Sequence, residues 1–363
     1  MRLTELYDKA LNLKDLTREE LLVLYEKAPT AELMALAHEL RKIQKKDDKY
    51  VGWIIDRNVN ITNICVAGCK FCNFSRKPGS PEGYVTTIEE YRVKIKELFE
   101  LGGDQLLLQG GLNPKLDLNF YINLFSSLKK EFPELKLHAL GPAEVAYLAK
   151  REKKTYKEVL LELKSAGLDS LPGAGAEILS DRVRKAVSPG KCTAGQWLEV
   201  MKAAHEINLP TSATMMFGFI ETTEERIDHL IKIRDLQKLK PESNWGFVTF
   251  VPWPYQSEDT LLKKEYPDIE ETTAIEYIRL VSLSRIALNN IENLQASWLT
   301  VGKEVAQICL HAGANDLGSI MIEENVVSAA GANYSMNAEE IQKTIKDAGF
   351  IPRRRNQKYE FVD

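Results

Sequence analysis

The 363-residue sequence has no apolar run long enough to cross a membrane: the longest, such as 214–220, fall far short of the roughly 20 residues that a membrane helix needs. It also lacks an excess of either charge, with 48 Lys and Arg against 52 Asp and Glu, which argues against a nucleic-acid-coating protein. Acidic side chains lie among the first nine residues, where a secretion signal would be apolar. We therefore expect a cytoplasmic protein that binds neither nucleic acid nor membrane.

Cysteine is scarce too, and its distribution is uneven. There are 5 cysteines in all, and three of them, Cys65, Cys69 and Cys72, lie close together. An odd number of clustered cysteines without a secretion signal argues against structural disulfides. The isolated Cys192 and Cys309 are expected to be small buried hydrophobic residues. The group of three needs another explanation.

Short apolar segments alternate with amphipathic helical stretches from Val59 onward. This alternation, repeated about eight times, predicts an α/β fold in which a parallel sheet closes into a (β/α)8 TIM-type barrel. A partial barrel remains the alternative, because the fourth and seventh predicted strands are weak. The predicted strands are 59–64, 105–109, 136–140, 170–171, 211–217, 246–251, 295–297 and 316–318. The predicted helices between them are 88–101, 118–131, 155–166, 196–207, 224–239 and 272–288.

Three regions follow from these patterns. Residues 1–50 are predicted to form an N-terminal helical extension, in which Thr17 and Glu20 make a capping-box pattern. Residues 51–330 are predicted to form the barrel. Residues 331–363 are predicted to form a C-terminal helix and tail, with the basic run 353–355 on the surface.

Barrels of this kind carry their chemistry on the loops that follow the strands. The cysteine group (65–72) follows the first predicted strand, and Gln109-Gly110-Gly111 follows the second. His138 lies in the third, 172–177 follows the fourth, and 252–256 follows the sixth. We therefore expect these unusual segments to meet at one end of the barrel.

The cysteines have the spacing C-x3-C-x2-C, which lets three thiolates converge on one metal centre. Sulfur ligands select zinc, copper(I) or iron–sulfur clusters. A structural zinc site needs a fourth ligand at similar spacing, which the sequence does not offer, and a thioredoxin-like pair leaves Cys65 unexplained. A [4Fe–4S] cluster usually takes four cysteines, so three leave one iron open. We favour such a cluster, with Cys65, Cys69 and Cys72 as ligands, over zinc or redox thiols.

The motif C-x3-C-x-Phe-C after the first strand resembles that of the radical S-adenosylmethionine (SAM) superfamily. The resemblance implies a [4Fe–4S] cluster whose open iron binds SAM, a 5′-deoxyadenosyl radical, and an electron donor such as flavodoxin or ferredoxin. It implies that Phe71 packs on the adenine and that Gly110 and Gly111 hold the methionine end, although two glycines after a strand also suit a simple turn. Glu177 is expected to bind SAM, or else to be an acid at a helix N-terminus.

Longer segments resemble a narrower group within that superfamily. This group contains the two radical SAM enzymes of the futalosine route to menaquinone and the enzymes that make the FO chromophore. The segments are 171–179, 182–184, 197–198, 204–205, 214–218 and 318–327.

In this group the stretch 246–256 discriminates between branches, and its Trp253 and Gln256 resemble the dehypoxanthine futalosine cyclases. That resemblance implies an enzyme of menaquinone biosynthesis that takes dehypoxanthine futalosine, abstracts hydrogen from ribose C4′ and cyclises the sugar onto the benzoate ring. The alternatives are an aminofutalosine synthase, an FO-synthase subunit and a non-enzymatic zinc-binding scaffold.

For the substrate, the resemblance and the loop positions together favour Trp253, Tyr255 and Gln256 as contacts, with rim packing as the alternative for the two aromatic residues. His138 is either a satisfied core histidine or a catalytic group that faces the lumen as a hydrogen-bond donor or base. A benzoate carboxylate needs an arginine or lysine partner. The candidates are Arg182, Arg184 and Lys191.

Overall fold

Parallel strands close into a ring in the computed structural model, which describes residues 2–46, 49–332 and 334–362. The first wall of the ring is one bent strand made of β1 and β2, which pairs with β8 at its start and with β3 at its end. Single bridges, His138–Ser170 and Leu171–Thr211, fill the fourth position. The strands are β1 (Tyr50–Ile54), β2 (Asp56–Asn60), β3 (Gln105–Gln109), β4 (Lys136–Ala139), β5 (Thr211–Phe217), β6 (Phe247–Pro254), β7 (Asn293–Leu294), β8 (Asp316–Ser319) and β9 (Ile351–Arg354).

The (β/α)8 barrel prediction is thus confirmed, and the ring closes through the bridge Gln295–Asp316 and the β8–β1 pair. The prediction of the first strand at 59–64 was wrong in position. The chain is already extended from Tyr50, and after Asn60 it leaves the ring for the cysteine loop.

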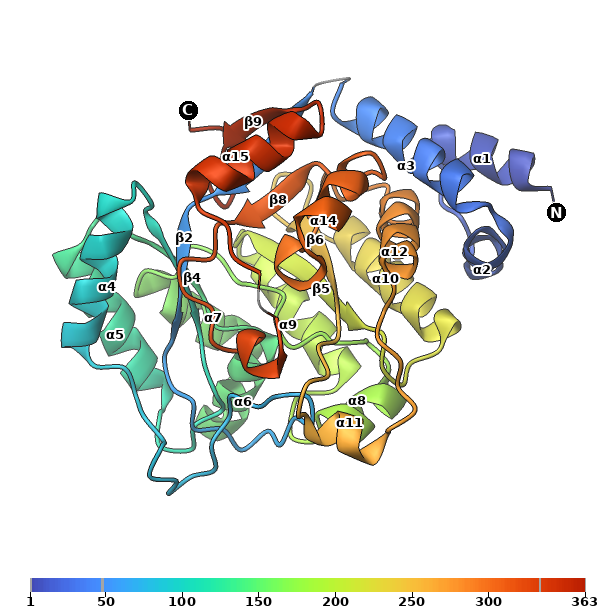
Figure 1. Ribbon diagram of the computed structural model, residues 1–363. Helices are drawn as coiled ribbons and strands as arrows, with labels where there is room; N and C mark the ends of the chain where they lie inside the picture. The colour runs from blue at the N-terminus through green and yellow to red at the C-terminus, as the bar shows by residue number, and fades with distance from the viewer. Residues whose placement is uncertain (1, 47–48, 333, 363) are drawn as a thin grey trace.

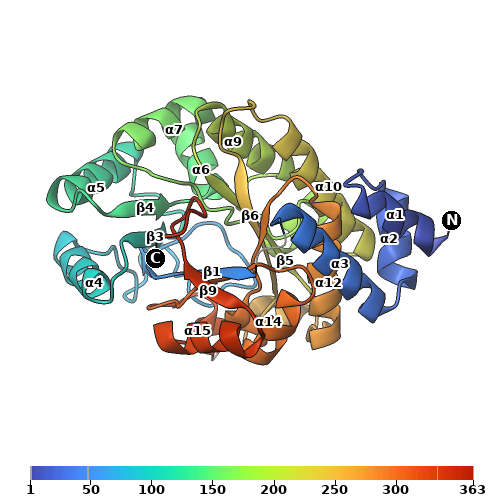
Figure 2. The same cartoon turned by 90° about the horizontal axis from the view of Figure 1, so that it is seen from above.

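Helices surround the ring (Figures 1 and 2). Several begin at a threonine whose hydroxyl accepts the backbone N–H three residues on, while the Glu or Gln at that position bonds back, as at Thr87 and Glu90. No helix in the described ranges is both long enough and apolar enough to cross a bilayer. The helices are α1 (Leu3–Leu11), α2 (Arg18–Lys27), α3 (Thr30–Gln44), α4 (Ile88–Glu100), α5 (Leu118–Glu131), α6 (Pro142–Glu152), α7 (Tyr156–Ser165), α8 (Asp181–Val187), α9 (Ala194–Glu206), α10 (Thr223–Lys238), α11 (Leu261–Glu265), α12 (Ala274–Ala287), α13 (Trp298–Val301), α14 (Lys303–Leu310), α15 (Ala338–Asp347) and the 3-10 turn η1 (Ser328–Ala330).

The N-terminal helices α2 and α3 lie against the outer side of α10 and α12, and α1 packs on α2 and α3 (Figure 2). Arginines of the barrel helices hold the connecting loops. Arg279 donates to the carbonyl of Ala28 at 2.9 Å, and Arg234 donates to the carbonyl of Leu16 at 2.9 Å. This extension therefore covers barrel helices at a distance from the strand ends that carry the cysteines.

The C-terminal strand β9 enters the base of the barrel, where it pairs in parallel with β1 on the side away from β8. The following Arg355 is only 3% exposed and bonds Asp316 through both ends of its guanidinium, at 2.5 and 2.7 Å. Gly52 leaves room for this pair, because a Cβ there would lie 2.3 Å from Asp316 Oδ2. The expectation that the basic run lies on the surface was wrong for Arg355, since β9 turns the chain inward (Figure 2).

Candidate active site inside the barrel

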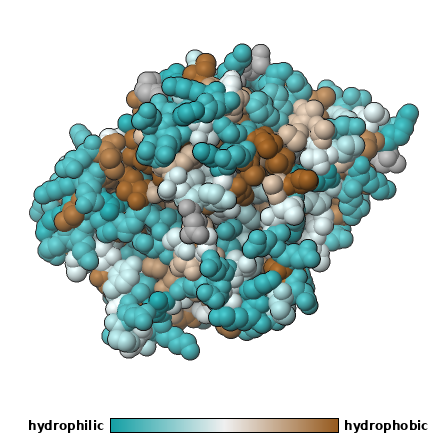
Figure 3. Space-filling view, in the orientation of Figure 1, coloured by the Kyte–Doolittle hydropathy of each residue, from teal (hydrophilic) through white to brown (hydrophobic). Residues whose placement is uncertain are grey.

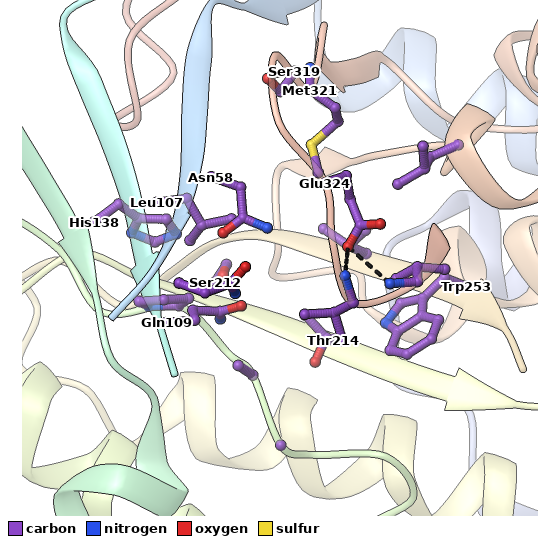
Figure 4. Close-up of a pocket in the computed structure, with 18 of the residues that line it drawn as sticks. Asn58, Leu107, Gln109, His138, Ser212, Thr214, Trp253, Ser319, Met321 and Glu324 are labelled. Carbon is purple, nitrogen blue, oxygen red and sulfur yellow. Dashed lines mark hydrogen bonds between the residues drawn. The ribbon is translucent and has the colours of Figure 1, made fainter. Parts of the chain in front are cut away.

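A cavity of about 410 Å³ lies inside the barrel, within the usual size range of small-molecule sites. One end of the cavity, the loop end, is formed by the loops after the strands, including the cysteine loop. Its walls are side chains that point inward from β2 to β6 (Figure 4). The opposite end, the base, is closed by Arg355, Gln357 and Tyr359 from the segment after β9. The cavity is therefore a pocket that is open at the loop end.

Cys65, Cys69 and Cys72 are free thiols, all partly buried, and all three line this cavity. The backbone N–H groups of Ala67 and Leu112 point at Cys65 Sγ at 3.4 and 3.3 Å, so the loop is already organised around the sulfur. Burial raises the pKa of Cys69 to about 12. The free thiol is therefore protonated, and a metal must displace its proton to bind the thiolate.

The three thiols fit an iron–sulfur cluster, whose ligands in proteins are cysteine thiolates. In the part of the chain that the structure describes, no three His, Cys, Asp or Glu side chains converge closely enough to hold one metal ion. A cluster places each thiolate on a different iron, so its ligands need not meet at one point. The donor set and the adjoining space thus suit a cluster with one uncovered iron.

The glycine pair after β3 packs directly on the cysteine loop. A Cβ at Gly111 would lie 2.2 Å from the carbonyl oxygen of Ile64 and 2.7 Å from Cys65 Cβ, so any side chain there would displace the loop. Gly110 has a backbone contact nearly as close, with Thr62 N at 3.1 Å from its ideal Cβ. The pair therefore has a packing role and also lines the cavity beside the cysteines.

Glu177 sits beside the cysteine loop with its backbone in the left-handed region (φ 42°), a costly conformation for a residue with a side chain. Its carboxylate is almost fully buried between two cations, with Lys191 Nζ at 2.6 Å and Arg184 Nη1 at 3.2 Å. Lys191 Nζ also lies over the Phe71 ring, 5.4 Å from its centroid. The predicted SAM contacts Phe71 and Glu177 are thus joined through Lys191 next to the cysteines.

The three candidate cations for a substrate carboxylate differ sharply in position. Arg182 is exposed and pairs with Glu225 on the outside of the barrel. Arg184 is buried, and its N–H groups are taken by Glu177 and by backbone carbonyls, among them that of Cys192 at 2.6 and 2.9 Å. Lys191 lines the cavity. Burial alone would lower the pKa of Lys191, but the charge and hydrogen bond of Glu177 raise it above its usual value.

His138 points into the lumen from β4 and is 6% exposed (Figure 4). Its Nδ1 lies 2.7 Å from Ser170 Oγ, and its Nε2 lies 3.4 Å from the amide nitrogen of Gln357. Since the amide nitrogen can only donate, we assign the proton to Nδ1 and a lone pair to Nε2. Burial lowers the pKa of His138 to about 3, so the ring is neutral at physiological pH.

The structure brings Trp253 to the cavity but not Tyr255 or Gln256. Trp253 is partly buried on β6, and its indole lies beside Thr214 (Figure 4). The Tyr255 hydroxyl bonds that of Thr260, and its ring contacts Phe219. Gln256 donates to its own strand, to the carbonyl of Pro254 at 3.1 Å. Because β6 ends at Pro254, the strand alternation that would point residue 255 inward has already stopped.

Sequence reasoning missed Glu144, a nearly buried carboxylate in the first turn of α6 that lines the cavity. Burial raises the pKa of Glu144 to about 7, against the opposing effect of the Gly110 N–H. Gly141-Pro142 at the end of the third predicted strand is a helix-start signal that places Glu144 at the mouth of the barrel. The lumen residue Asn58 was missed as well, because the first strand was expected to begin after it.

Comparisons with known proteins cover nearly the whole chain. Residues 59–233 match the family model described as the radical SAM superfamily, and residues 244–363 match the one described as the CofH/MqnC C-terminal region. Two proteins named cyclic dehypoxanthine futalosine synthase are similar to it. The one from Streptomyces coelicolor is 42% identical over 96% of this chain and 86% of its own length; the one from Halalkalibacterium halodurans is 40% identical over 100% and 95%.

A protein from Methanosarcina mazei named 5-amino-6-(D-ribitylamino)uracil–L-tyrosine 4-hydroxyphenyl transferase 2 is also similar, at 38% identity over 96% of this chain and 89% of its own. Among solved structures, methylornithine synthase (PylB) superimposes with a TM-score of 0.73 at 17% identity, over 97% of this chain and 98% of its own. The [FeFe]-hydrogenase maturase HydG also reaches 0.73 at 17% identity, over 98% and 76%.

Proposed function

This chain belongs to the radical SAM superfamily, in the group that carries the CofH/MqnC C-terminal region, and we propose that it converts dehypoxanthine futalosine to cyclic dehypoxanthine futalosine in menaquinone biosynthesis. The observation that carries this proposal is the near full-length similarity to two cyclic dehypoxanthine futalosine synthases. Trp253, one of the residues by which this sequence resembles the cyclases, lines the cavity and supports the same function.

In this proposal Cys65, Cys69 and Cys72 hold a [4Fe–4S] cluster. Phe71, Gly110, Gly111 and Glu177 bind SAM beside it, with Lys191 and Arg184 holding the Glu177 carboxylate in place. When bound, the two cofactors supply a radical that removes hydrogen from the substrate's ribose C4′. The chain's contribution is placement and exclusion: the closed ring and its plugged base keep water and other C–H bonds away from the reacting carbon.

The cyclisation ends with the loss of a proton from the benzoate ring and of one electron, for which the oxidised cluster would be the acceptor. We propose that His138, whose neutral ring accepts a long 3.4 Å hydrogen bond from the Gln357 amide at Nε2, takes up that proton at Nε2 once this amide is displaced. Trp253 stacks on the aromatic part of the substrate from the opposite wall. These two roles place the sugar and the ring of the substrate between β4 and β6.

Reduction of the cluster requires an electron donor, and we propose a flavodoxin or ferredoxin. The cysteine loop supports this proposal because it reaches the surface: Val66, directly after Cys65, is 44% exposed. Such a donor and free thiols are both features of the cytoplasm, where we place the enzyme.

The test is an anaerobic assay of the purified protein after reconstitution with iron and sulfide. With SAM, a reductant and dehypoxanthine futalosine, we expect the cyclic product and release of 5′-deoxyadenosine. A parallel reaction with tyrosine and 5-amino-6-(D-ribitylamino)uracil tests the transferase activity named for the 38% identical relative. A third, with the enolpyruvyl substrate of aminofutalosine synthase, tests for incorporation of the adenosyl group. Turnover in either of these alone would refute the proposal, and a colourless protein with bound zinc would refute the whole class.

A further inference from the structure

Asn58, Leu107 and His138 form one row across three neighbouring strands of the barrel wall. The register pairs Asn58 with Leu107 and Leu107 with His138, so all three side chains point to the same face, and all three line the cavity. With strands about 4.8 Å apart, the two polar members stand about 10 Å apart at Cα, one on each side of the leucine. Figure 4 shows the amide and the imidazole on the lumen side of this wall.

The Asn58 amide is the unusual member of the row. Two buried side-chain atoms that lack a hydrogen-bond partner in the described chain line the cavity, Asn58 Oδ1 and Thr249 Oγ1. The Thr249 hydroxyl rotates freely and has the Tyr359 hydroxyl within reach, but the Asn58 carboxamide is only 5% exposed. A buried acceptor without a donor costs about 1–3 kcal/mol, so its persistence in this lumen points to a ligand.

The chemistry of the row selects the ligand group. The Asn58 amide has N–H donors as well as an acceptor, but the atom without a partner in the described chain is its oxygen. A carboxylate has no proton to offer this oxygen or His138 Nε2, whereas a hydroxyl can donate to both. The floor below is no better for a carboxylate, because Arg355 is already paired with Asp316 and a second acid, Asp56, lies close by. Between the two acceptors, Leu107 offers an apolar surface of the kind that packs on the C–H face of a sugar.

We propose that Asn58, Leu107 and His138 form the subsite for the hydroxyl-bearing sugar end of the substrate. Asn58 Oδ1, which has no partner among the described residues, accepts from one ribose hydroxyl, and His138 Nε2 accepts from another in place of its long 3.4 Å contact with the Gln357 amide. The assignment rests on the proposed function for the identity of the sugar. It directs the benzoate end toward Trp253, across the lumen, and makes Asn58 a specificity-determining residue of the first wall.

The test is the near-isosteric variant Asn58→Leu, with Asn293→Leu as the matched control. Asn293 is a buried asparagine outside the cavity whose amide donates to the carbonyl of Val248 and accepts from Asn315, at 2.8 and 2.9 Å. Calorimetry on the reconstituted, unreduced enzyme with SAM should show that Asn58→Leu binds dehypoxanthine futalosine at least ~10-fold more weakly, with an unchanged Kd for SAM. Its Tm should equal or exceed that of the wild type, because a buried amide oxygen without a partner in the described part of the chain has been removed. The control should lose Tm and keep the substrate affinity.

Analogues with one ribose hydroxyl replaced by hydrogen complete the test. At least one analogue should bind the wild type more weakly than dehypoxanthine futalosine does, and the same analogue should bind Asn58→Leu as tightly as dehypoxanthine futalosine does. An Asn58→Leu variant that binds dehypoxanthine futalosine like the wild type and loses Tm like the control would overturn the subsite. If the wild type does not bind dehypoxanthine futalosine, the proposed function fails, and the comparison is repeated with 5-amino-6-(D-ribitylamino)uracil, whose polyol presents the same hydroxyls. Binding of neither probe to the wild type would overturn the subsite as well.

Discussion

Replacing Arg355 with methionine should destabilise the protein strongly, although this residue belongs to a basic run that the sequence alone places on the surface. The guanidinium is 3% exposed, bonds Asp316 at 2.5 and 2.7 Å, and lies 3.8 Å from the centroid of the Tyr359 ring. Methionine keeps most of the apolar stem but removes all of these contacts. Asp316 then remains a buried charge without a cation.

Breaking a buried ion pair by removing one partner costs about 3–5 kcal/mol, and we expect Arg355→Met to fall in this range. The assay is urea unfolding followed by circular dichroism. Arg353→Met is the matched control from the same basic run: Arg353 is partly exposed over the rings of Tyr50 and Phe361, so its replacement should cost about 1 kcal/mol or less.

A double variant separates the ion pair from the general packing of this region. Asp316→Asn keeps an acceptor for the Gly318 N–H, which Asp316 Oδ1 binds at 2.7 Å. Combined with Arg355→Met it removes both charges, so the double variant should be at least about 2 kcal/mol more stable than the sum of the single effects predicts. If Arg355→Met costs no more than Arg353→Met, the segment after β9 does not plug the barrel and this reasoning fails.

Three further predictions concern the loop end of the cavity. Cys69→Ala should yield a protein with little bound iron and no brown colour after anaerobic reconstitution. Cys309→Ala, a change in the core on α14, should keep the iron and the colour. Equal iron in the two variants would contradict the cluster assignment. Glu144 has a pKa raised from 4.5 to about 7 by burial, so its carboxyl lowers stability as the pH rises between these values. Glu144→Gln should lack this slope and be more stable than the wild type at pH 8, by up to about 3 kcal/mol, and parallel pH profiles in urea would refute it. Trp253→Ala should raise the KM for dehypoxanthine futalosine at least ~10-fold, and Tyr255→Phe should leave the KM within about 2-fold, because of these two residues only Trp253 lines the cavity. A larger rise in KM for Tyr255→Phe than for Trp253→Ala would exclude the stacking role.

The parts of the fold that the sequence predicts well are those with local signals. The strands at 105–109 and 211–217 each contain a short apolar run, 106–108 and 215–217, and the structure has β3 and β5 at these residues. Helix starts follow from threonine caps such as Thr87 and Thr222. The first strand was misplaced because its inward face carries Asp56, Asn58 and Asn60, which read as polar loop rather than strand. A strand that lines a site for a polar ligand carries polar side chains on its inward face, so its sequence lacks the apolar pattern that identifies a buried strand.

The residues of the site also differ in how well the sequence predicts them. Cys65, Cys69, Cys72 and Phe71 belong to one short motif, so a local pattern was enough to find them. Arg355 and Gln357 reach the cavity only because β9 pairs with β1 from the far end of the sequence, and no local pattern signals that pairing. Tyr255 and Gln256 were expected in the cavity because they follow a barrel strand, but their own neighbours bind them instead.

The pairing of β9 with β1 also has a consequence for biosynthesis. The ribosome makes residues 50–54 early and residues 351–355 only after every other strand of the ring has been made. Until then this rim of the nascent barrel, at its base, remains open, and Asp316 has no Arg355 to pair with. Contacts between such distant segments slow folding, since the intervening chain must be ordered before they form. Closure of this rim is therefore a late step of folding, and the period before it is when the newly made chain is most exposed to aggregation and to proteases.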